Sequence, residues 1–196
     1  SVNGQDNPAE IIQRAVGANR HVIDWSQKNP SSGTTASQSW TSGYHYATLY
    51  LFKSGSSHVP HVMISLENHN SPEEVTKLFD RARNQDQDKN PEILAENFGP
   101  GSGSILRKYT ELYNRDGTPV GRPAYRADAY GEGWLLKVIV YNRINESVVP
   151  DLIAGRIARS LAEDIFNLIK PAEITGPPKI QSIQAKVQHL SRTSAF

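Results

Sequence analysis

Residues 104–143 constrain the fold of this chain more than any other stretch. They have the pattern of three consecutive β-strands joined by two tight turns, at 114–117 and 130–133. Strands joined by such short turns must run antiparallel, because a parallel connection needs a crossover of a dozen or more residues. An amphipathic segment follows at about 147–170, where apolar residues recur with a period of 3.6. The stretch therefore predicts an antiparallel meander with a helix laid against one face.

A further pair of strands is predicted upstream, at 43–53 and 58–68, around turn residues 54–57. Alternation places aliphatic side chains on one face of this hairpin and Tyr, Phe, His and Met side chains on the other. A sheet with bulky residues on both faces is usually covered on both sides, or it lines a pocket. We interpret the aromatic face as core beneath a helix. A surface that stacks a sugar or an apolar ligand is the alternative.

Two earlier helices begin with the same local signal. Asn7 and Ser71 are suitable N-cap residues, each followed by a proline at the first helical position and by a glutamate at N3. We assign Ser147 as the N-cap of the last long helix, which should end before Pro171. Residues 21–25 fit either a short strand or a continuation of the first helix.

These elements predict one α+β domain over residues 1–170. Its antiparallel sheet should have about five strands, a hairpin plus a three-stranded meander, flanked by helices in the order α-ββ-α-βββ-α. The third strand of the meander is the most apolar and should be central. Residues 27–39 and 84–103 are polar or rich in Gly and Pro, and we interpret them as loops. Residues 171–196 should form a linker and a short amphipathic tail helix at 179–192.

Composition excludes several classes of protein. The chain has 196 residues, 21 basic and 20 acidic, so its net charge of +1 gives no reason to expect a nucleic-acid partner. It has no cysteine, which excludes disulfides, thiol nucleophiles and thiolate metal sites. No apolar run reaches the length of a membrane span. The start at Ser1 without Met and the polar texture favour a periplasmic or extracellular protein, with the cytoplasm as the alternative.

Motifs for catalysis or cofactor binding are weak. The hairpin carries four histidines, but His58 and His61 point to opposite faces, so we expect no metal site. The run 99–104 is rich in glycine but lacks the Lys-Ser/Thr of a phosphate loop and leads into a strand. No Gly-x-Ser-x-Gly elbow is present. We therefore assign no catalytic residue and no cofactor.

The charged face of the meander is the best candidate site. Alternation places cationic and tyrosine side chains on one face, together with Glu111 and Asp128, and we predict ligand-binding roles for Arg107, Tyr109, Arg122, Arg126, Lys137 and Tyr141. Arginine offers a planar fork for a carboxylate, a phosphate or a glycan. The alternative is an ordinary solvent face with cross-strand ion pairs. If the site exists, Ala at both Arg122 and Arg126 should abolish binding and leave the melting temperature unchanged.

The sequence thus favours a non-enzymatic binding or accessory domain. Its partner would be a small anionic or glycan-like ligand, or another protein, bound by the charged face together with the 84–103 loop. Two alternatives come from other classes. One is a small hydrolase with a site near His45, His61 and the glycine-rich run. The other is a structural subunit that assembles through residues 179–192.

Overall fold

The last strand of the meander lies at the centre of the structure. The computed structural model describes residues 7–19, 25–27, 31–34, 43–53, 60–69, 71–85, 91–110, 116–118, 123–144 and 147–169. Within them, eight strands form one antiparallel sheet whose main path runs β1-β3-β4-β8-β7-β6-β5, with β2 also paired to β3. The α+β class and the central place of β8 are confirmed, but the sheet has more strands than the five expected.

The strands of this sheet are β1 (Trp25–Gln27), β2 (Ser31–Thr34), β3 (Tyr44–Lys53), β4 (Val62–His69), β5 (Glu92–Glu96), β6 (Gly103–Tyr109), β7 (Ala124–Gly131) and β8 (Trp134–Tyr141). The hairpin β3–β4 and the meander β6–β7–β8 are joined by antiparallel pairing of β4 with β8. A separate pair is formed by β9 (Arg143–Ile144) and β10 (Ser147–Val148).

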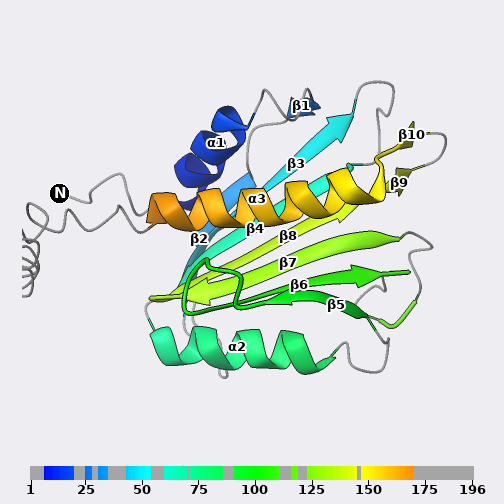
Figure 1. Cartoon of the computed structure of the whole chain (residues 1–196). Helices are drawn as coiled ribbons and strands as arrows, with labels where there is room; N and C mark the ends of the chain where they lie inside the picture. The colour runs from blue at the N-terminus through cyan, green and yellow to red at the C-terminus, as the bar shows by residue number, and fades with distance from the viewer. Residues whose placement is uncertain are drawn as a thin grey trace, which may run out of the picture.

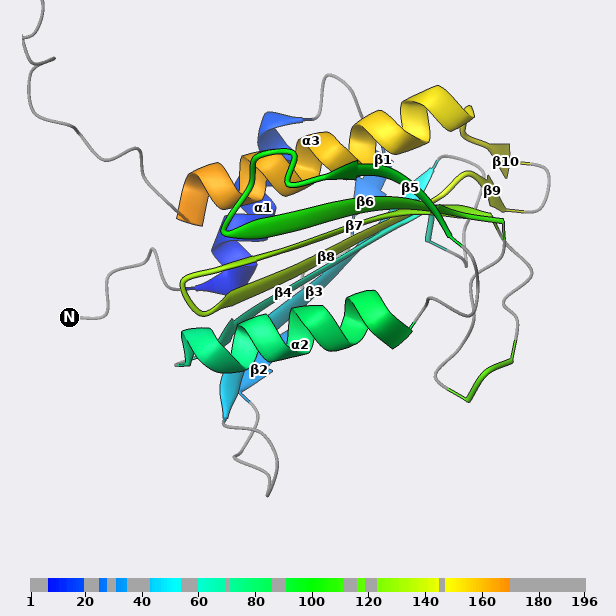
Figure 2. The same cartoon turned by 60° about the horizontal axis from the view of Figure 1, so that its bottom comes forward.

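Within the described ranges, three helices cover the two faces of the sheet. α1 (Pro8–Ala18) and α3 (Asp151–Ile169) pack on one face, and α2 (Pro72–Gln85) packs on the other (Figure 1, Figure 2). Of the three predicted N-caps, Asn7 and Ser71 are present. The Ala9 amide donates to Asn7 Oδ1 at 3.0 Å, and the Glu74 amide donates to Ser71 Oγ at 3.3 Å. The described helices therefore begin where the sequence predicts, with the exception of α3.

α3 begins at Asp151, not at Ser147 as expected. Ser147 and Val148 instead form β10 and pair with β9. Pro150 explains the later start, because a proline disfavours the helical conformation in the residue before it. Its carbonyl then accepts the first hydrogen bonds of the helix, from the amides of Ile153 at 3.0 Å and Ala154 at 2.9 Å.

Both predicted loops contain strands. β2 and part of β1 fall within 27–39, and β5 falls within 84–103. These strands lie at the two edges of the sheet, and every residue of β2 is exposed. An exposed edge strand is held by backbone pairing and needs no alternation of apolar residues, so the pattern used to find strands is absent there. The predicted turn at 114–117 and the tail helix at 179–192 lie partly or wholly outside the described residues.

The main core lies between the sheet and the pair α1–α3. α3 buries one stripe of side chains, including Ile157, Leu161 and Ile165, against β7 and β8. The facing side chains of β8, Leu136, Val138 and Val140, are fully buried. Each such side chain contributes about 1.5 to 3 kcal/mol on burial. This face of the meander is the scaffold that the sequence predicts.

The second face is only partly covered. α2 buries Val75 and Phe79 on this side, mainly over β7 and β8, and the Phe79 ring lies 4.6 Å from that of Tyr130. We expected the aromatic face of the β3–β4 hairpin to be core beneath a helix, but Tyr50 in β3 is 38% exposed. The helix is displaced toward the meander, so the β3 side of this face retains accessible surface.

No helix among the described residues is long and apolar enough to cross a membrane.

Candidate ligand-binding face

Cross-strand pairing brings the described members of the predicted site onto one face of the sheet. Arg107 in β6 pairs with Arg126 in β7, and Asp128 in β7 pairs with Lys137 in β8. Tyr109 and Tyr141 both pair with Ala124, from the two neighbouring strands. Because side chains alternate along a strand, these residues point to the α2 side. Arg122 and Glu111 lie outside the described residues.

Asp128 is the centre of a compact ionic network. Arg126 binds it through two nitrogens, with Nε 2.7 Å from Oδ2 and one terminal nitrogen 2.8 Å from Oδ1. Arg107 adds a third contact, at 2.9 Å to Oδ2. Two-point contacts of this kind are among the strongest hydrogen bonds in proteins and fix the geometry of both partners. Both carboxylate oxygens are therefore engaged by the neighbouring arginines.

The network is mostly buried. Arg107 is 1% exposed and Asp128 is 4% exposed. Burial raises the pKa of Asp128, but the charges and hydrogen bonds of Arg126 and Arg107 outweigh this effect, so that its pKa lies below the usual value. The carboxylate is therefore ionised across the neutral range.

Arg107 also links the sheet to the end of α2. One of its terminal nitrogens lies 3.5 Å from the carbonyl oxygen of Arg83, in the last turn of that helix. Carbonyls in the last turn have no partner within the helix, and the dipole of the helix favours a cation there. Its guanidinium also lies over the Tyr109 ring, 5.5 Å from the centroid. Arg107 and the buried Tyr109 thus lie beneath the accessible surface of this face and do not form part of it.

The accessible part of this face extends from the network toward β3. Cross-strand rows can be followed through the register from β3 to β7, and one of them carries Thr48, Ser65, Lys137 and Asp128 side by side. The next row carries Tyr50, Met63, Ile139 and Arg126. We call the partly or fully exposed members of these two rows, with Tyr141, the open face: Thr48, Tyr50, Met63, Ser65, Arg126, Lys137 and Tyr141.

Sequence reasoning did not include the β3 and β4 members of the open face in the site. Thr48 and Ser65 carried no signal of their own, and Tyr50 and Met63 were interpreted as core. The missing information was the pairing of β4 with β8, which joins the hairpin to the meander. Period-2 alternation fixes which side a residue faces, but it does not reveal which distant strand is its neighbour.

The three described histidines of the hairpin do not converge, and His58 lies outside the described residues. His45 is exposed on the face that α1 and α3 cover, where its Nδ1 lies 2.8 Å from Thr34 Oγ1. His61 is buried on the opposite face at the other end of the hairpin, with Nδ1 3.0 Å from the Tyr141 carbonyl. His69 Nε2 lies 2.8 Å from Glu67 Oε2. Within the part of the chain that is described, no cluster of three or more His, Asp or Glu could hold a metal ion.

The glycine-rich run packs at the end of β7 and does not border the open face. Gly101 has a positive φ of 69°, and a Cβ there would meet the carbonyl oxygen of Tyr130 and the ring of Phe166 in α3. The Ser102 amide donates to that same carbonyl at 2.7 Å. Glycine is needed here because two backbones approach closely beneath α3. The structure therefore does not bring this run together with His45 and His61, or with Lys137.

Comparison with known proteins identifies no relative. No family model, no curated protein and no solved structure matches the chain.

Proposed function

We propose that this chain is a non-enzymatic binding domain that recognises an anionic, glycan-like ligand on its open face. The observation that carries the proposal is a local excess of positive charge. Among the described strand residues, Arg107, Arg126 and Lys137 lie around the carboxylate of Asp128. Two further acids lie on this face among the described strand residues: Glu67 contacts His69, and Glu96 is paired with Arg83. An anion is the ligand that such a surface favours.

The members of the cluster have different roles in this proposal. Arg107 is buried, and it holds Asp128 in place. Arg126 makes a two-point contact with the same carboxylate, and a small fraction of its side chain is exposed. Lys137 is half-buried at the border of the open face, and in this proposal its ammonium is the group that the ligand contacts. A lysine at the rim of a preformed ionic network provides charge without having to order its neighbours on binding.

The surroundings of Lys137 favour a sugar over a bare inorganic anion. Thr48 and Ser65 lie in its cross-strand row and supply hydroxyls that both donate and accept hydrogen bonds. Tyr50, in the adjacent row, is 38% exposed and offers an aromatic ring for stacking. Charge, hydroxyls and an aromatic ring on a rigid sheet match an acidic carbohydrate such as a uronic-acid oligomer.

Calorimetric titration of the full chain with an oligogalacturonate tests the proposal. We expect saturable binding that Lys137→Ala weakens about tenfold, because a charge-assisted hydrogen bond is lost. Lys108→Ala is the matched control. Lys108 is also a strand lysine, but it points to the opposite face, where it contacts Asp151 at 3.2 Å. Binding by Lys108→Ala should equal that of the wild type, and raised salt should weaken it in both.

Two results would count against the proposal. One is equal affinity for a neutral galactose oligomer of the same length. The other is unchanged affinity in Lys137→Ala while the variant keeps the melting temperature of the wild type.

A further inference from the structure

The row of side chains next to that of Lys137, toward the start of β3, carries the opposite charge. Tyr46 in β3 pairs with Glu67 in β4, and Glu67 pairs with Leu135 in β8. All three side chains are half-buried. Because side chains on one face recur every two residues, this row lies about 7 Å from the row of Lys137. We call Tyr46, Glu67 and Leu135 the acidic row.

Glu67 is held in a defined orientation. Its Oε2 lies 2.8 Å from Nε2 of His69, which follows two residues later on the same face. The Tyr44 ring stacks on the His69 ring, with centroids 4.4 Å apart. The His69 side chain is 1% exposed, whereas that of Glu67 is 26% exposed. The carboxylate is therefore oriented by a buried ring and is still accessible to a ligand.

The geometry favours a neutral His69 beside Glu67. An ionised carboxylate only accepts hydrogen bonds, so Nε2 is the nitrogen that carries a proton. The other ring nitrogen, Nδ1, is buried and has no hydrogen-bond partner in the described part of the chain. A doubly protonated ring would therefore bury a charged N–H group without an acceptor, at a high desolvation cost. A neutral ring leaves the negative charge of Glu67 uncancelled.

Tyr46 gives the acidic row an aromatic surface. It pairs with Gly33 of the edge strand β2, and a Cβ at Gly33 would lie 3.1 to 3.3 Å from atoms of the Tyr46 side chain. The ring therefore packs over a backbone that carries no side chain, and the exposed part of the ring can stack with a sugar. Tyr50 follows four residues later on β3, about 13 Å away. A ligand that reaches both rings must be longer than a single sugar.

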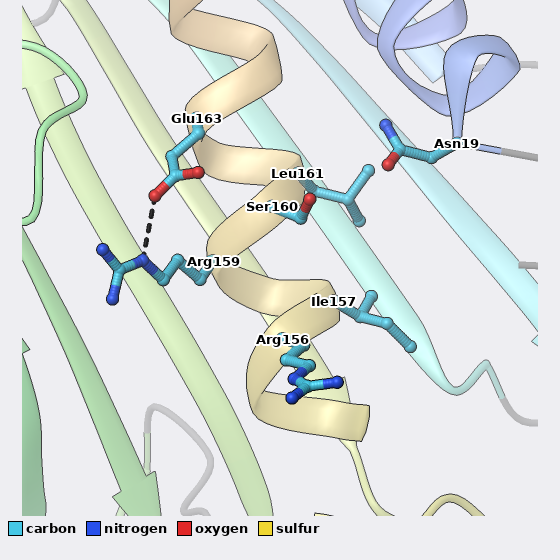
Figure 3. Close-up of a pocket in the computed structure, with 7 residues that line it drawn as sticks. All are labelled: Asn19, Arg156, Ile157, Arg159, Ser160, Leu161 and Glu163. Carbon is cyan, nitrogen blue, oxygen red and sulfur yellow. Dashed lines mark hydrogen bonds and ion pairs between the residues drawn. The ribbon is translucent and has the colours of Figure 1, made fainter. Parts of the chain in front are cut away.

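The groove on the other side of the sheet has a different character. It has a volume of about 330 Å³ and lies between α1 and α3 (Figure 3). Its apolar lining residues, Ile157 and Leu161, are buried, and its Arg159 and Glu163 form an ion pair at 2.9 Å. The described residues that line it include no aromatic ring on which a sugar could stack. The acidic row, by contrast, continues the open face directly.

We propose that the ligand of the open face is an oligosaccharide of alternating charge, with an acidic sugar at Lys137 and a neutral sugar next to it, over Tyr46 and beside Glu67. This inference rests on the proposed function and adds selection against consecutive acidic sugars. The spacing of the two rows is close to the length of one sugar unit, so neighbouring sugars meet opposite charges. In a uniform uronic-acid chain, the Glu67 carboxylate would repel a second carboxylate. A neutral sugar would instead donate its hydroxyl groups to Glu67.

Calorimetric titration of the full chain at pH 8 compares two hexasaccharides. One is a hyaluronan oligomer, in which glucuronate alternates with N-acetylglucosamine, and the other is hexagalacturonate. Because the two differ in linkage, the decisive comparison is made within each ligand. Glu67→Gln should raise the affinity for hexagalacturonate about threefold, because it removes one repulsion between like charges. It should not raise the affinity for the hyaluronan oligomer, which places a neutral sugar at this position.

Glu96→Gln is the matched control for charge. Glu96 is also an ion-paired glutamate on this face, 2.6 Å from Arg83, and its replacement changes the net charge equally. It lies on the edge strand β5, so both affinities should stay within about twofold of the wild type.

Two variants of Tyr46 test the aromatic contact. Tyr46→Leu should weaken the binding of both oligomers about fivefold, because the stacking ring is lost. Tyr46→Phe keeps the ring and should retain most of the affinity. A melting curve for each variant will check that it folds.

Three results would overturn the inference. They are unchanged affinity of Glu67→Gln for hexagalacturonate, an equal gain for hexagalacturonate in Glu96→Gln, and an equal gain for both oligomers in Glu67→Gln. In each case, binding of hexagalacturonate that depends on Lys137 would still support the proposed function. If the wild type binds neither oligomer, the proposed function and this inference are both wrong.

Discussion

At the scale of single residues, Asp128 determines the character of the second face. Its buried carboxylate is held by Arg126 of the same strand and by Arg107 of the neighbouring strand β6. Arg107 also extends to the end of α2. A buried ion pair is weak evidence for stability when compared with an apolar replacement, but removal of one partner leaves an uncompensated charge in the interior. Each of the three side chains in the network therefore needs the others to compensate its charge in the interior.

Replacement of Asp128 tests this directly. Asp128→Asn should lower the free energy of unfolding by about 3 kcal/mol at pH 7, because two guanidiniums lose their shared counter-charge. Urea denaturation measures the change. Asp80→Asn, at an exposed carboxylate on α2, is the control and should stay within about 0.5 kcal/mol of the wild type. A loss below 1 kcal/mol in Asp128→Asn would contradict the role given to the network.

The same residue gives a pH signature. The pKa of Asp128 is lower in the folded chain than the value of 3.8 expected when it is unfolded. A lowered pKa contributes stability that is complete above pH 3.8 and is lost as the pH falls through the folded pKa. The difference in stability between the wild type and Asp128→Asn should therefore shrink as the pH falls below about 4.

Part of the site could be predicted from residue types, but the burial of Arg107 and Asp128 could not. Alternation correctly grouped Arg107, Arg126 and Lys137 on one face. It treated Arg126 as a surface side chain whose loss would leave melting unchanged. The structure revises that expectation, because Arg126 forms an ion pair with a buried carboxylate. Removal of the Arg126 side chain should therefore be destabilising. Only the position of α2 distinguishes a solvent face from a covered one, and no pattern within the strands encodes it.

At the scale of elements, the turn between β7 and β8 was predicted where it occurs. Its two loop residues, Glu132 and Gly133, have φ values of 51° and 86°. Two residues with positive φ characterise the type I′ turn, whose twist matches that of paired strands. The edge strands and the start of α3 were wrong in the prediction, for the physical reasons given above. Elements that bury a face leave a pattern in sequence, and elements held by backbone pairing alone do not.

Gly133 should be the least replaceable residue of this turn. Besides its positive φ, a Cβ at this position would meet the carbonyl oxygen of His69 in the neighbouring strand β4. Gly133→Ala should therefore cost about 2 to 5 kcal/mol, as backbone strain and overpacking add.

Gly117 provides the matched control. Its φ of 85° is nearly the same, but no neighbouring atom lies within 4 Å of a Cβ there. Gly117→Ala should cost only about 1 to 2 kcal/mol, the conformational part alone. Equal losses in the two variants, measured by thermal denaturation, would show that the contact with His69 adds nothing.

At the scale of the whole molecule, protection should fall from the centre of the sheet toward its edges. β8 lies in the middle of the strand order and its core-facing residues are fully buried, whereas β2 and β5 are edge strands with mostly exposed residues. Amide hydrogen exchange should be slowest in β8 and its neighbours β4 and β7, and fastest in β2 and β5. Exchange in β5 as slow as in β8 would contradict this order.

The pairing of β4 with β8 also bears on how the chain folds. The hairpin and the meander can each form from neighbouring segments, but β4 and β8 are separated by roughly 70 residues along the chain. Loop-closure entropy must be overcome before that seam contributes any contact energy. We therefore expect docking of the two halves along the seam to limit the folding rate. Neither half alone presents both sides of the central core, so the two halves acquire a stable native state together.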